Sequence, residues 1–498
     1  MPASTNMKLL FIELNEAEQY FFDKLEREGR LPTLARLRQG GVFLRTHIPQ
    51  WKADADKAWR AISPWIIWPS VYTGMPPERH GIVGFGQDSQ SLRGRCVWDV
   101  LDRAGVSIGI FGSLMSYPPR NQGAARFYVP ESLADDPACF PAEARPVQEF
   151  CVFSARNYSE SFSTRALKAI LMLLNATRGG VRLKTVLRTL GQVPSELMRG
   201  ASVVPQRAML HSYICADAFK RLYQKHRPSY ATLHLNHIAY MQHRYWRAAE
   251  PNRFSKNLSP TDSRFFRSVA ERTAYEQKFA HWIDKSFTYT DALVSDLLQM
   301  VDDSTVVLIA SGLGQRPMDP VDQIHNPVVR LVHEDELFSA IGLRDYKVMH
   351  QMNPDVTVNF RNEISAGVAA AALEGLYVRG DEPFFVVQRR GAQVFLELNM
   401  PCREKPDEVL RIRHRTLAQI DVPIGRYIRE HATNDQSTAH HKDTGWLLAF
   451  SKGFQLVSER KFVPVTDIAP TVLSLYGLQP QPWMEANAQP AFHVATRA

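Results

Sequence analysis

Short apolar runs rich in β-branched residues recur along the chain, and longer stretches with apolar residues at helical spacing lie between them. Runs of this kind predict buried strands: Lys8–Asn15, Ser107–Gly112, Tyr230–Asn236, Thr305–Ser311 and Trp446–Ser451. The longer stretches predict helices, among them Leu31–Arg38, Val97–Ala104, Phe287–Met300 and Asp467–Tyr476. Strands that alternate with helices indicate an α/β fold, a doubly wound and mostly parallel sheet with helices on both faces.

Two segments interrupt this alternation. Residues 161–229 are predominantly helical and rich in Met, Leu and basic residues, and we expect them to form an insertion or cap over the sheet. Residues 351–401 combine an Ala-rich helix with two strand-like runs joined by a hairpin-sized connection, which predicts a small α+β excursion. The core is then expected to comprise residues 1–160, 230–350 and 402–498.

Composition and charge narrow the range of functions. An apolar content of 45% and a charged content of 22% are ordinary globular values. The net charge of +8 is uneven, because twelve Lys and Arg residues lie between Arg165 and Arg227 against two acids, Glu196 and Asp217. Such a block meets an anionic substrate, a membrane surface or nucleic acid, or is simply a solvated helical face. It carries no recognisable nucleic-acid-binding motif and its aromatics are not interleaved with the cations, so no nucleic-acid partner is expected.

The cysteines and the apolar stretches suggest a compartment. The five cysteines are scattered and include no CxxC pair, which argues against a disulfide framework and against a thiolate zinc site. The N-terminus enters a strand without the long apolar run of a signal peptide, and no apolar stretch is long enough to cross a bilayer. We therefore expect a cytoplasmic protein without a transmembrane segment; its oligomeric state stays open.

The stretch Ser63–Phe85 is the most informative in the chain. Ser63 is suited to cap a helix and Pro64 to occupy its first position, while Thr73-Gly74 and His80-Gly81-Ile82 predict a helix end and a tight turn. The positive end of a helix dipole suits a hydroxyl that attacks a phosphate group or holds it in place. A capped helix followed by a Gly/Pro turn accounts for the same residues.

This stretch resembles the alkaline phosphatase superfamily, especially its type I phosphodiesterase/nucleotide pyrophosphatase-like branch. In that branch a nucleophilic Thr or Ser opens a helix, and a Thr-Gly, Pro, His-Gly-Ile run follows. Further pieces occur in the same order: Lys8–Asn15, Trp98–Pro119 and Val465–Gly477. The spacing of the resemblance places the nucleophile at Pro64, next to Ser63, with Ser70 as a substitute. It also implies two divalent metals, held by Asp and His residues at strand ends, that activate the nucleophile.

The position that the resemblance gives to the first metal-binding Asp holds Asn15. Glu13 shares that side of the strand by alternation and is either a metal ligand or part of a structural salt bridge, and Glu16 lies just beyond. The family's later Asp-x-x-x-His pattern matches His243, but Ala239 stands at the Asp position. Asn236 and His237 are substitutes there, within a segment that holds three histidines, the first of which is His234.

The two remaining metal positions differ from each other. Where the family has an Asp-His pair after a strand, this chain has Gly312-Leu313, and His325 is a substitute without supporting spacing. Before the strand Trp446–Ser451, where the family has a metal-binding His, stand His440 and His441. The resemblance thus implies the metal ligands Asn15, Glu13, Asn236, His243, His440 and His441, in a one-metal or rearranged site that takes zinc or manganese. Arg244 and Lys442 would contribute positive charge toward the substrate.

Two functions remain open at this point. The first is a metal-dependent hydrolase or transferase acting on a phosphate ester or phosphodiester, with Ser63 as the catalytic hydroxyl and a small or medium anionic phosphate-containing substrate. The second is a catalytically inactive protein of the same fold that serves as a binding or assembly module for an anionic ligand. The missing Asp-His pair favours the second, whereas the gathering of histidines at strand ends favours the first.

Overall fold

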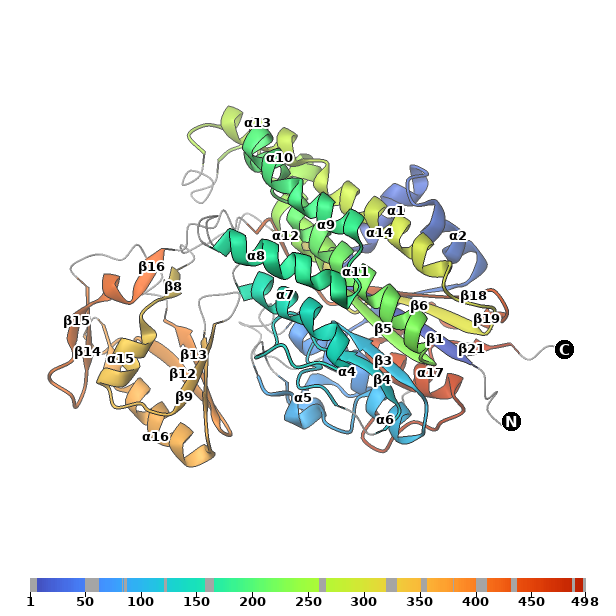
Figure 1. Cartoon of the computed structure of the whole chain (residues 1–498). Helices are drawn as coiled ribbons and strands as arrows, with labels where there is room; N and C mark the ends of the chain where they lie inside the picture. Colours follow the sequence, from blue (N-terminus) through green and yellow to red (C-terminus); the bar gives the residue numbers. More distant parts are fainter. Residues whose placement is uncertain are drawn as a thin grey trace. The chain divides into compact units, whose positions relative to one another are not determined.

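The computed structural model (Figure 1) describes residues 7–49, 62–82, 84, 87–120, 123–156, 165–258, 266–318, 329–350, 356–378, 380–399, 410–430, 437–485 and 489–495. The chain forms two compact units. The first contains the described residues of 1–83, 89–320 and 436–498, and the second those of 84–88 and 321–435.

The first unit is built on an eight-stranded sheet. Its strands, in spatial order, are β20 (Phe462–Pro464), β2 (Val42–His47), β18 (Thr444–Ser451), β6 (Thr305–Ser311), β1 (Lys8–Leu14), β5 (Tyr230–Leu235), β3 (Ile108–Phe111) and β4 (Ala125–Val129). The strand pairings show that only β18 runs opposite to the others. The predicted mostly parallel α/β fold is therefore confirmed, and each predicted strand is present with its ends shifted by at most two residues.

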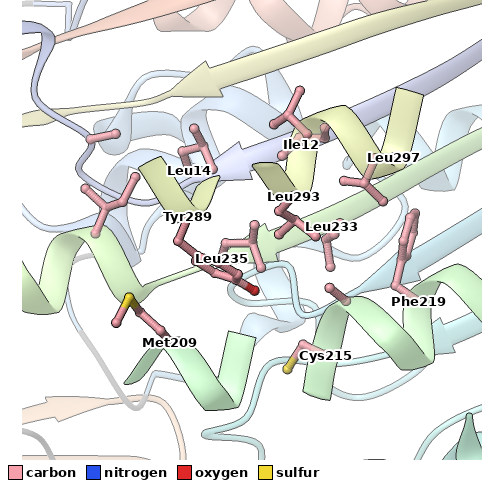
Figure 2. Packing of buried hydrophobic residues seen from close by; sticks show 14 of the residues in the cluster. Ile12, Leu14, Met209, Cys215, Phe219, Leu233, Leu235, Tyr289, Leu293 and Leu297 are labelled. Carbon is pink, nitrogen blue, oxygen red and sulfur yellow. The ribbon is translucent and has the colours of Figure 1, made fainter. Parts of the chain in front are cut away.

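One face of the sheet packs against helices that supply most of the large core. These are α1 (Gln19–Arg27), α2 (Pro32–Gly40), α11 (Gln206–His226), α12 (His237–Ala249) and α14 (Trp282–Leu298). Figure 2 shows Ile12 and Leu14 of β1 directed toward Leu293 and Leu297 of α14. Because side chains alternate along a strand, the odd-numbered residues of β1 face the other way.

The opposite face of β1 meets α4 (Pro64–Thr73), which contacts α6 (Val97–Arg103) and α17 (Ile468–Leu475). The ring of Phe11 on β1 lies 6.4 Å from that of Trp68 on α4, and Tyr72 packs between Trp68 and Trp98. Side chains at positions 11, 13 and 15 therefore point toward α4. Glu13, and Asn15 just after the strand, therefore lie beside α4, the helix that Ser63 caps.

The basic segment expected at 161–229 forms α8 (Arg165–Asn175), α9 (Leu183–Leu190), α10 (Gln192–Arg199) and the long α11. Buried residues of these helices, such as Leu173, Val186 and Met209, belong to the same hydrophobic core as the sheet. The segment is helical as predicted, but it is continuous with the first unit because its apolar faces pack against α7 (Arg145–Arg156) and the sheet helices.

The second unit is larger than the excursion expected at 351–401. Its four-stranded antiparallel sheet has the order β12 (Phe385–Arg390), β13 (Gln393–Leu398), β10 (Val356–Phe360) and β9 (Tyr346–His350), with α16 (Glu363–Glu374) packed against it. Strands β11 (Leu376–Tyr377), β14 (Arg411–His414) and β15 (Asp421–Pro423) form a second sheet. Residues from Leu331 to Ile428 share one core, so the flanking segments belong with the predicted hairpin and helix.

The described residues contain no helix that is both long and apolar enough to span a bilayer.

Candidate metal centre

Glu16 lies at the centre of a polar cluster at the carboxyl end of β1. Its φ of 55° is in the left-handed region, which an L-residue with a side chain adopts only when its surroundings impose it. Gln242 on α12 holds this turn: its Nε2 donates to the Glu16 carbonyl at 2.6 Å, and its Oε1 accepts from the amide of Glu18. The carboxylate of Glu16 is buried, so it requires positive or hydrogen-bonding partners.

His243, the next residue on α12, is one such partner. Its Nε2 lies 2.8 Å from Oε2 of Glu16, and its Nδ1 lies 3.1 Å from the carbonyl oxygen of Ala439. A carbonyl can only accept, so Nδ1 carries a proton and Nε2 is the atom available for a metal in the neutral ring. A backbone acceptor on the distal nitrogen is the usual arrangement around a metal-bound histidine.

A two-stranded ribbon supplies the remaining partners. β17 (Ala439–Lys442) pairs antiparallel with β7 (Gly314–Pro317), so that His441 lies opposite Gln315. The Nε2 of His441 is 3.2 Å from Oε2 of Glu16, and the Nε2 of Gln315 donates to the same oxygen at 2.6 Å. Directly opposed residues face the same side of a ribbon, so this pairing aims both side chains at Glu16.

The electrostatics couple these groups. Burial alone would raise the pKa of Glu16, but the neighbouring His441 and His243 lower it well below the ordinary value. Burial alone would lower the pKa of His441, but the Glu16 carboxylate and a hydrogen bond with the backbone of Ile62 raise it. In the metal-free protein a proton on His441 balances the charge of the Glu16 carboxylate, and a divalent ion would replace that proton.

The cluster adjoins the start of α4. The backbone of Ile62, which hydrogen-bonds His441, directly precedes Ser63. Ser63 is the N-cap of α4, as predicted: its Oγ accepts from the amide of Trp65 at 3.3 Å, and Pro64 occupies the first helical position. The predicted hydroxyl at the head of this helix, that of Ser63, therefore belongs to the residue that follows Ile62, whose backbone contacts His441.

The donor atoms of Glu16, His243 and His441 all lie within 4.8 Å of one another. One carboxylate oxygen and two imidazole nitrogens are a donor set that zinc accepts in catalytic sites, with coordination positions left for water or substrate. The same set suits other first-row divalent ions. The residues present therefore fit a single divalent metal ion of the type that the resemblance implies.

Glu13 does not join this cluster. Its Oε2 accepts from Tyr72 Oη at 2.7 Å and lies 3.0 Å from His234 Nδ1, while its Oε1 accepts from Ser113 Oγ at 3.0 Å. The carboxylate is completely buried, and burial together with its negative charge raises the pKa of Tyr72 well above the ordinary value. Of the two interpretations offered for Glu13, the geometry matches the structural one, a buried hydrogen-bonded carboxylate between β1, β5 and α4.

Asn15 and Asn236 lie beside Glu16 and organise it. The Nδ2 of Asn15 donates to Glu16 Oε1 at 3.1 Å and to Asn236 Oδ1 at 2.7 Å, while the Oδ1 of Asn15 accepts from the Trp68 indole at 2.9 Å. Asn236 is exposed at the carboxyl end of β5. The one oxygen with which Asn15 would bind a metal is thus already engaged by Trp68.

The three histidines of 234–243 reach three different environments. His234 ends in the Glu13 network, and His237 lies between the hydroxyls of Ser212 and Thr290 at 3.0 and 2.8 Å, where burial lowers its pKa to about 3. Only His243 contacts Glu16. Residues six apart on a helix point to different faces, which separates His237 from His243.

The remaining predicted residues have partners other than Glu16 in the contacts that the structure shows. His440 lies opposite Arg316 on the β17–β7 ribbon and faces the other side from His441. Lys442 forms an ion pair with the buried Glu18 at 3.0 Å, and the guanidinium of Arg244 stacks on Tyr240 at 4.8 Å. Of these three residues, Lys442 alone is shown to contact the segment that follows β1, through Glu18.

Ser70, the substitute nucleophile, is buried within α4 with its Oγ 3.1 Å from Nε2 of His80. The amide of Ile82 donates to the Nδ1 of the same ring, so Nε2 carries the proton and donates to Ser70. Burial lowers the pKa of His80 to about 4, which keeps the ring neutral at physiological pH. A ring in this state cannot accept the Ser70 proton, and the His-Gly-Ile motif anchors the turn after α4.

The Gly312-Leu313 position contains no metal donor. Leu313 is fully buried, and Gly312 lies beside the apolar side chains of Val71 and Ile67 on α4. His325, the proposed substitute, lies outside the described residues.

Sequence reasoning gave Glu16 only a neighbouring role and did not identify Gln315. The available signal was the position of Glu16 directly after a predicted strand, together with the missing carboxylate at Ala239. The two positions are connected in the structure, because Gln315 Nε2 donates both to the Ala239 carbonyl at 3.3 Å and to the Glu16 carboxylate.

Comparisons with known proteins identify the family of the chain. The family model described as type I phosphodiesterase / nucleotide pyrophosphatase matches residues 17–423. No curated protein sequence gives a significant match.

Similar solved structures cover nearly the whole chain at low identity. Human ectonucleotide pyrophosphatase/phosphodiesterase 5 is 12% identical, with 95% of this chain and 96% of that chain covered and a TM-score of 0.36. Phosphonoacetate hydrolase from Sinorhizobium meliloti 1021 in complex with phosphonoformate is 14% identical, with 94% of each chain covered and a TM-score of 0.36. Alkaline phosphatase PafA is 14% identical, with 98% of this chain and 99% of that chain covered and a TM-score of 0.44.

The family match spans most of the chain, including the α4 motif, His243 and the sheet strands β2, β3, β4, β5 and β6; β1, β18, Glu16 and His441 lie outside the matched residues. The chain, with its mostly parallel α/β sheet, therefore belongs to the type I phosphodiesterase / nucleotide pyrophosphatase family.

Proposed function

We propose that this protein is a phosphoester hydrolase that works with one divalent metal ion held by Glu16, His243 and His441. The observation that carries the proposal is the convergence of these three side chains at the carboxyl end of the sheet, next to the residue that precedes Ser63. Ligands of open α/β sheets bind at this edge.

The residues of the chain have separate tasks in this proposal. Ser63, at the start of α4, attacks phosphorus or anchors the phosphate, and the helix dipole favours the negative charge there. Gln315 and Gln242 hold Glu16 in place through its carboxylate and its carbonyl. When bound, the metal supplies Lewis-acid charge stabilisation to the phosphoryl oxygens. Zinc and manganese are both consistent with the donor set.

The second candidate function is a non-catalytic module that binds an anionic ligand. It is favoured because this chain lacks metal-binding side chains at positions where the resemblance implies ligands for a second metal. Asn15 has its oxygen bonded to Trp68, and the apolar Gly312-Leu313 segment replaces the Asp-His pair.

One experiment separates the two functions. Metal-stripped protein is reconstituted with zinc or manganese, and metal content is measured together with hydrolysis of p-nitrophenyl phosphate and bis-p-nitrophenyl phosphate. The hydrolase proposal expects turnover that depends on metal and is lost in Glu16→Gln and His441→Ala. His440→Ala is the matched control, because the neighbouring ring faces the other side of the ribbon.

Metal binding without turnover of either ester, combined with binding of inorganic phosphate, would support the non-catalytic module instead. No metal binding at Glu16 in any preparation would overturn the metal-dependent proposal.

A further inference from the structure

A second group of metal-donor residues lies away from the Glu16 centre, in the helical part of the first unit. Cys151 on α7 faces His211 and Cys215 on α11. Figure 2 shows Cys215 among buried apolar side chains of the core. His211 and Cys215 are four residues apart, so one face of α11 presents both donors to Cys151.

The distances between the donors match those of a tetrahedral metal site. Sγ of Cys151 and Sγ of Cys215 are 3.8 Å apart, and Cys215 Sγ is 3.8 Å from His211 Nδ1. With Zn–S bonds of about 2.3 Å and Zn–N bonds of about 2.0 Å, a tetrahedron has S···S edges of roughly 3.8 Å and S···N edges of roughly 3.5 Å. A disulfide would need the sulfurs at about 2.05 Å. Both thiols are free.

The surroundings favour a cation at this position. Cys151 and Cys215 are buried, whereas His211 is half-buried. A thiolate in an apolar core is costly without a positive partner. Two thiolates and a neutral imidazole would balance the charge of a divalent ion.

We propose that Cys151, His211 and Cys215 bind a zinc ion or a similar thiophilic divalent metal, separate from the Glu16 centre. Three protein ligands leave a fourth coordination position for water. The ion would fasten α7 to α11, and so close the chain segment that carries the basic helices α8, α9 and α10. Its role is structural in this arrangement, because metal binding adds to folding stability when the unfolded chain lacks the site.

Cobalt(II) substitution tests this proposal in the full-length protein. Thiolate ligands give cobalt an intense near-ultraviolet charge-transfer absorption, which the oxygen and nitrogen donors of the Glu16 centre cannot produce. The proposal expects this absorption at one equivalent per chain, lost in Cys151→Ala and Cys215→Ala. It should persist in Cys139→Ser, the control thiol outside the cluster, and in Glu16→Gln, so the outcome is independent of the proposed function.

If the cysteine variants fail to fold, His211→Ala, at a half-buried position, serves in their place and should shift or weaken the absorption. Absence of thiolate absorption in the folded wild-type protein would overturn the proposal. So would a Cys151–Cys215 disulfide, found by peptide mass spectrometry in protein purified under argon with zinc present.

A different observation concerns the outer surface of α8 and α9. Leu167, Leu171 and Leu174 of α8 are 66%, 57% and 44% exposed, and Leu183 and Leu187 of α9 are 64% and 60% exposed. Their spacing puts each set on one helix face, an apolar stripe that faces away from the core. Scattered single apolar residues are normal on a surface, but two such stripes close in sequence mark a docking surface.

The charges around these stripes identify the partner. The exposed cations Lys168, Arg178, Lys184 and Arg188 accompany them, whereas Arg182 is paired with Asp217, and the described residues of α8 and α9 contain no acid. Basic helices with an outward apolar stripe are typical of segments that lie in the interface of an anionic bilayer. We infer that α8 and α9 bind an anionic lipid surface, the stripe entering the headgroup region and the cations contacting phosphates.

Sedimentation with lipid vesicles tests this inference. Binding to phosphatidylcholine vesicles containing phosphatidylglycerol should exceed binding to phosphatidylcholine alone by about tenfold or more, and should weaken with salt. Leu171→Asp should abolish it. Ile364→Asp, at an 80% exposed position in the second unit, is the control and should not change it. Equal binding to both vesicles, or self-association of the protein that Leu171→Asp removes in place of vesicle binding, would overturn the inference.

Discussion

Nε2 of His243 lies 2.8 Å from Oε2 of Glu16, so that a helix following β5 and a turn following β1 meet at one carboxylate oxygen. Gln242, the neighbour of His243, holds the same turn by its main chain. Two consecutive residues of α12 thus fix both the position of Glu16 and its charge partner. Position 239, where the family pattern has a carboxylate, is an alanine in this chain, and His243 contacts the carboxylate of Glu16 after the adjacent strand.

Glu16→Gln and Glu13→Gln are predicted to separate metal binding from stability. Glu16→Gln removes the anionic ligand, so the bound metal should fall from near one equivalent to none at this centre. Glu13→Gln disturbs the bonds from Tyr72, Ser113 and His234 and should cost about 1–3 kcal/mol of unfolding free energy with the metal retained. Elemental analysis and urea unfolding measure the two effects; metal loss in Glu13→Gln alone would contradict this assignment.

The stability of the metal-free protein should depend on pH with a defined sign. The lowered pKa of Glu16 contributes stability above its ordinary value of 4.5, which is lost as pH falls through the depressed value. The raised pKa of His441 contributes stability below its ordinary value of 6.5, which is lost as pH rises through the raised value. We therefore expect a maximum between these limits and a decline above neutrality, measured by urea unfolding in the presence of a chelator.

Glu16→Gln should flatten that profile on both sides. Added zinc should change the alkaline side, because metal binding requires deprotonated histidines and strengthens as pH rises. A decline above neutrality that is equally steep in Glu16→Gln would show that other groups cause it.

Substitutions of Ser63 distinguish a capping role from a chemical one. Ser63→Ala should cost about 1 kcal/mol of stability through the lost cap on Trp65, and should also lower kcat. Ser63→Asn keeps a capping oxygen without a hydroxyl, so it should restore stability but not kcat, whereas Ser63→Thr should keep both. Full activity in Ser63→Asn would assign the serine to the cap alone.

Ser70→Ala is predicted to leave kcat near the wild-type value. Its partner His80 donates through Nε2 and remains neutral, because its pKa is about 4, so the pair has no base to activate the hydroxyl. The variant should show only a modest loss of unfolding free energy. A kcat reduced more strongly than in Ser63→Ala would reverse the two assignments.

Asn15→Asp tests the lost family ligand. An aspartate there would bring a second carboxylate to where Nδ2 now lies, 3.1 Å from Glu16 Oε1, and repulsion should destabilise the metal-free protein by on the order of 2 kcal/mol. A divalent ion compensates such a pair, so the gain in melting temperature on adding zinc should exceed that of the wild type. An equal gain in both proteins would show that position 15 does not reach the metal.

The sequence by itself determined five of the eight strands of the main sheet, several helices and the head of α4, but not β2, β4, β20 or the strand order. Apolar runs such as Thr305–Ser311 have one stable placement, inside a sheet covered on both faces, and the Ser63-Pro64 cap is a local matter of hydrogen bonding. The motif reading also pointed to His243 and to the pair His440 and His441, between which it did not choose.

Only the tertiary structure decided which polar residues meet. The sequence pattern favoured Glu13 over Glu16 as a ligand, yet Glu13 faces Tyr72 and His234 while the left-handed turn at Glu16 aims its carboxylate at α12 and the β17–β7 ribbon. Likewise the absence of a CxxC pair argued against thiolate ligands, whereas the packing of α7 on α11 brings Cys151 and Cys215 together. Local pattern specifies which face of an element is buried, but contacts between residues far apart in sequence follow from how the elements pack, and periodicity does not encode that.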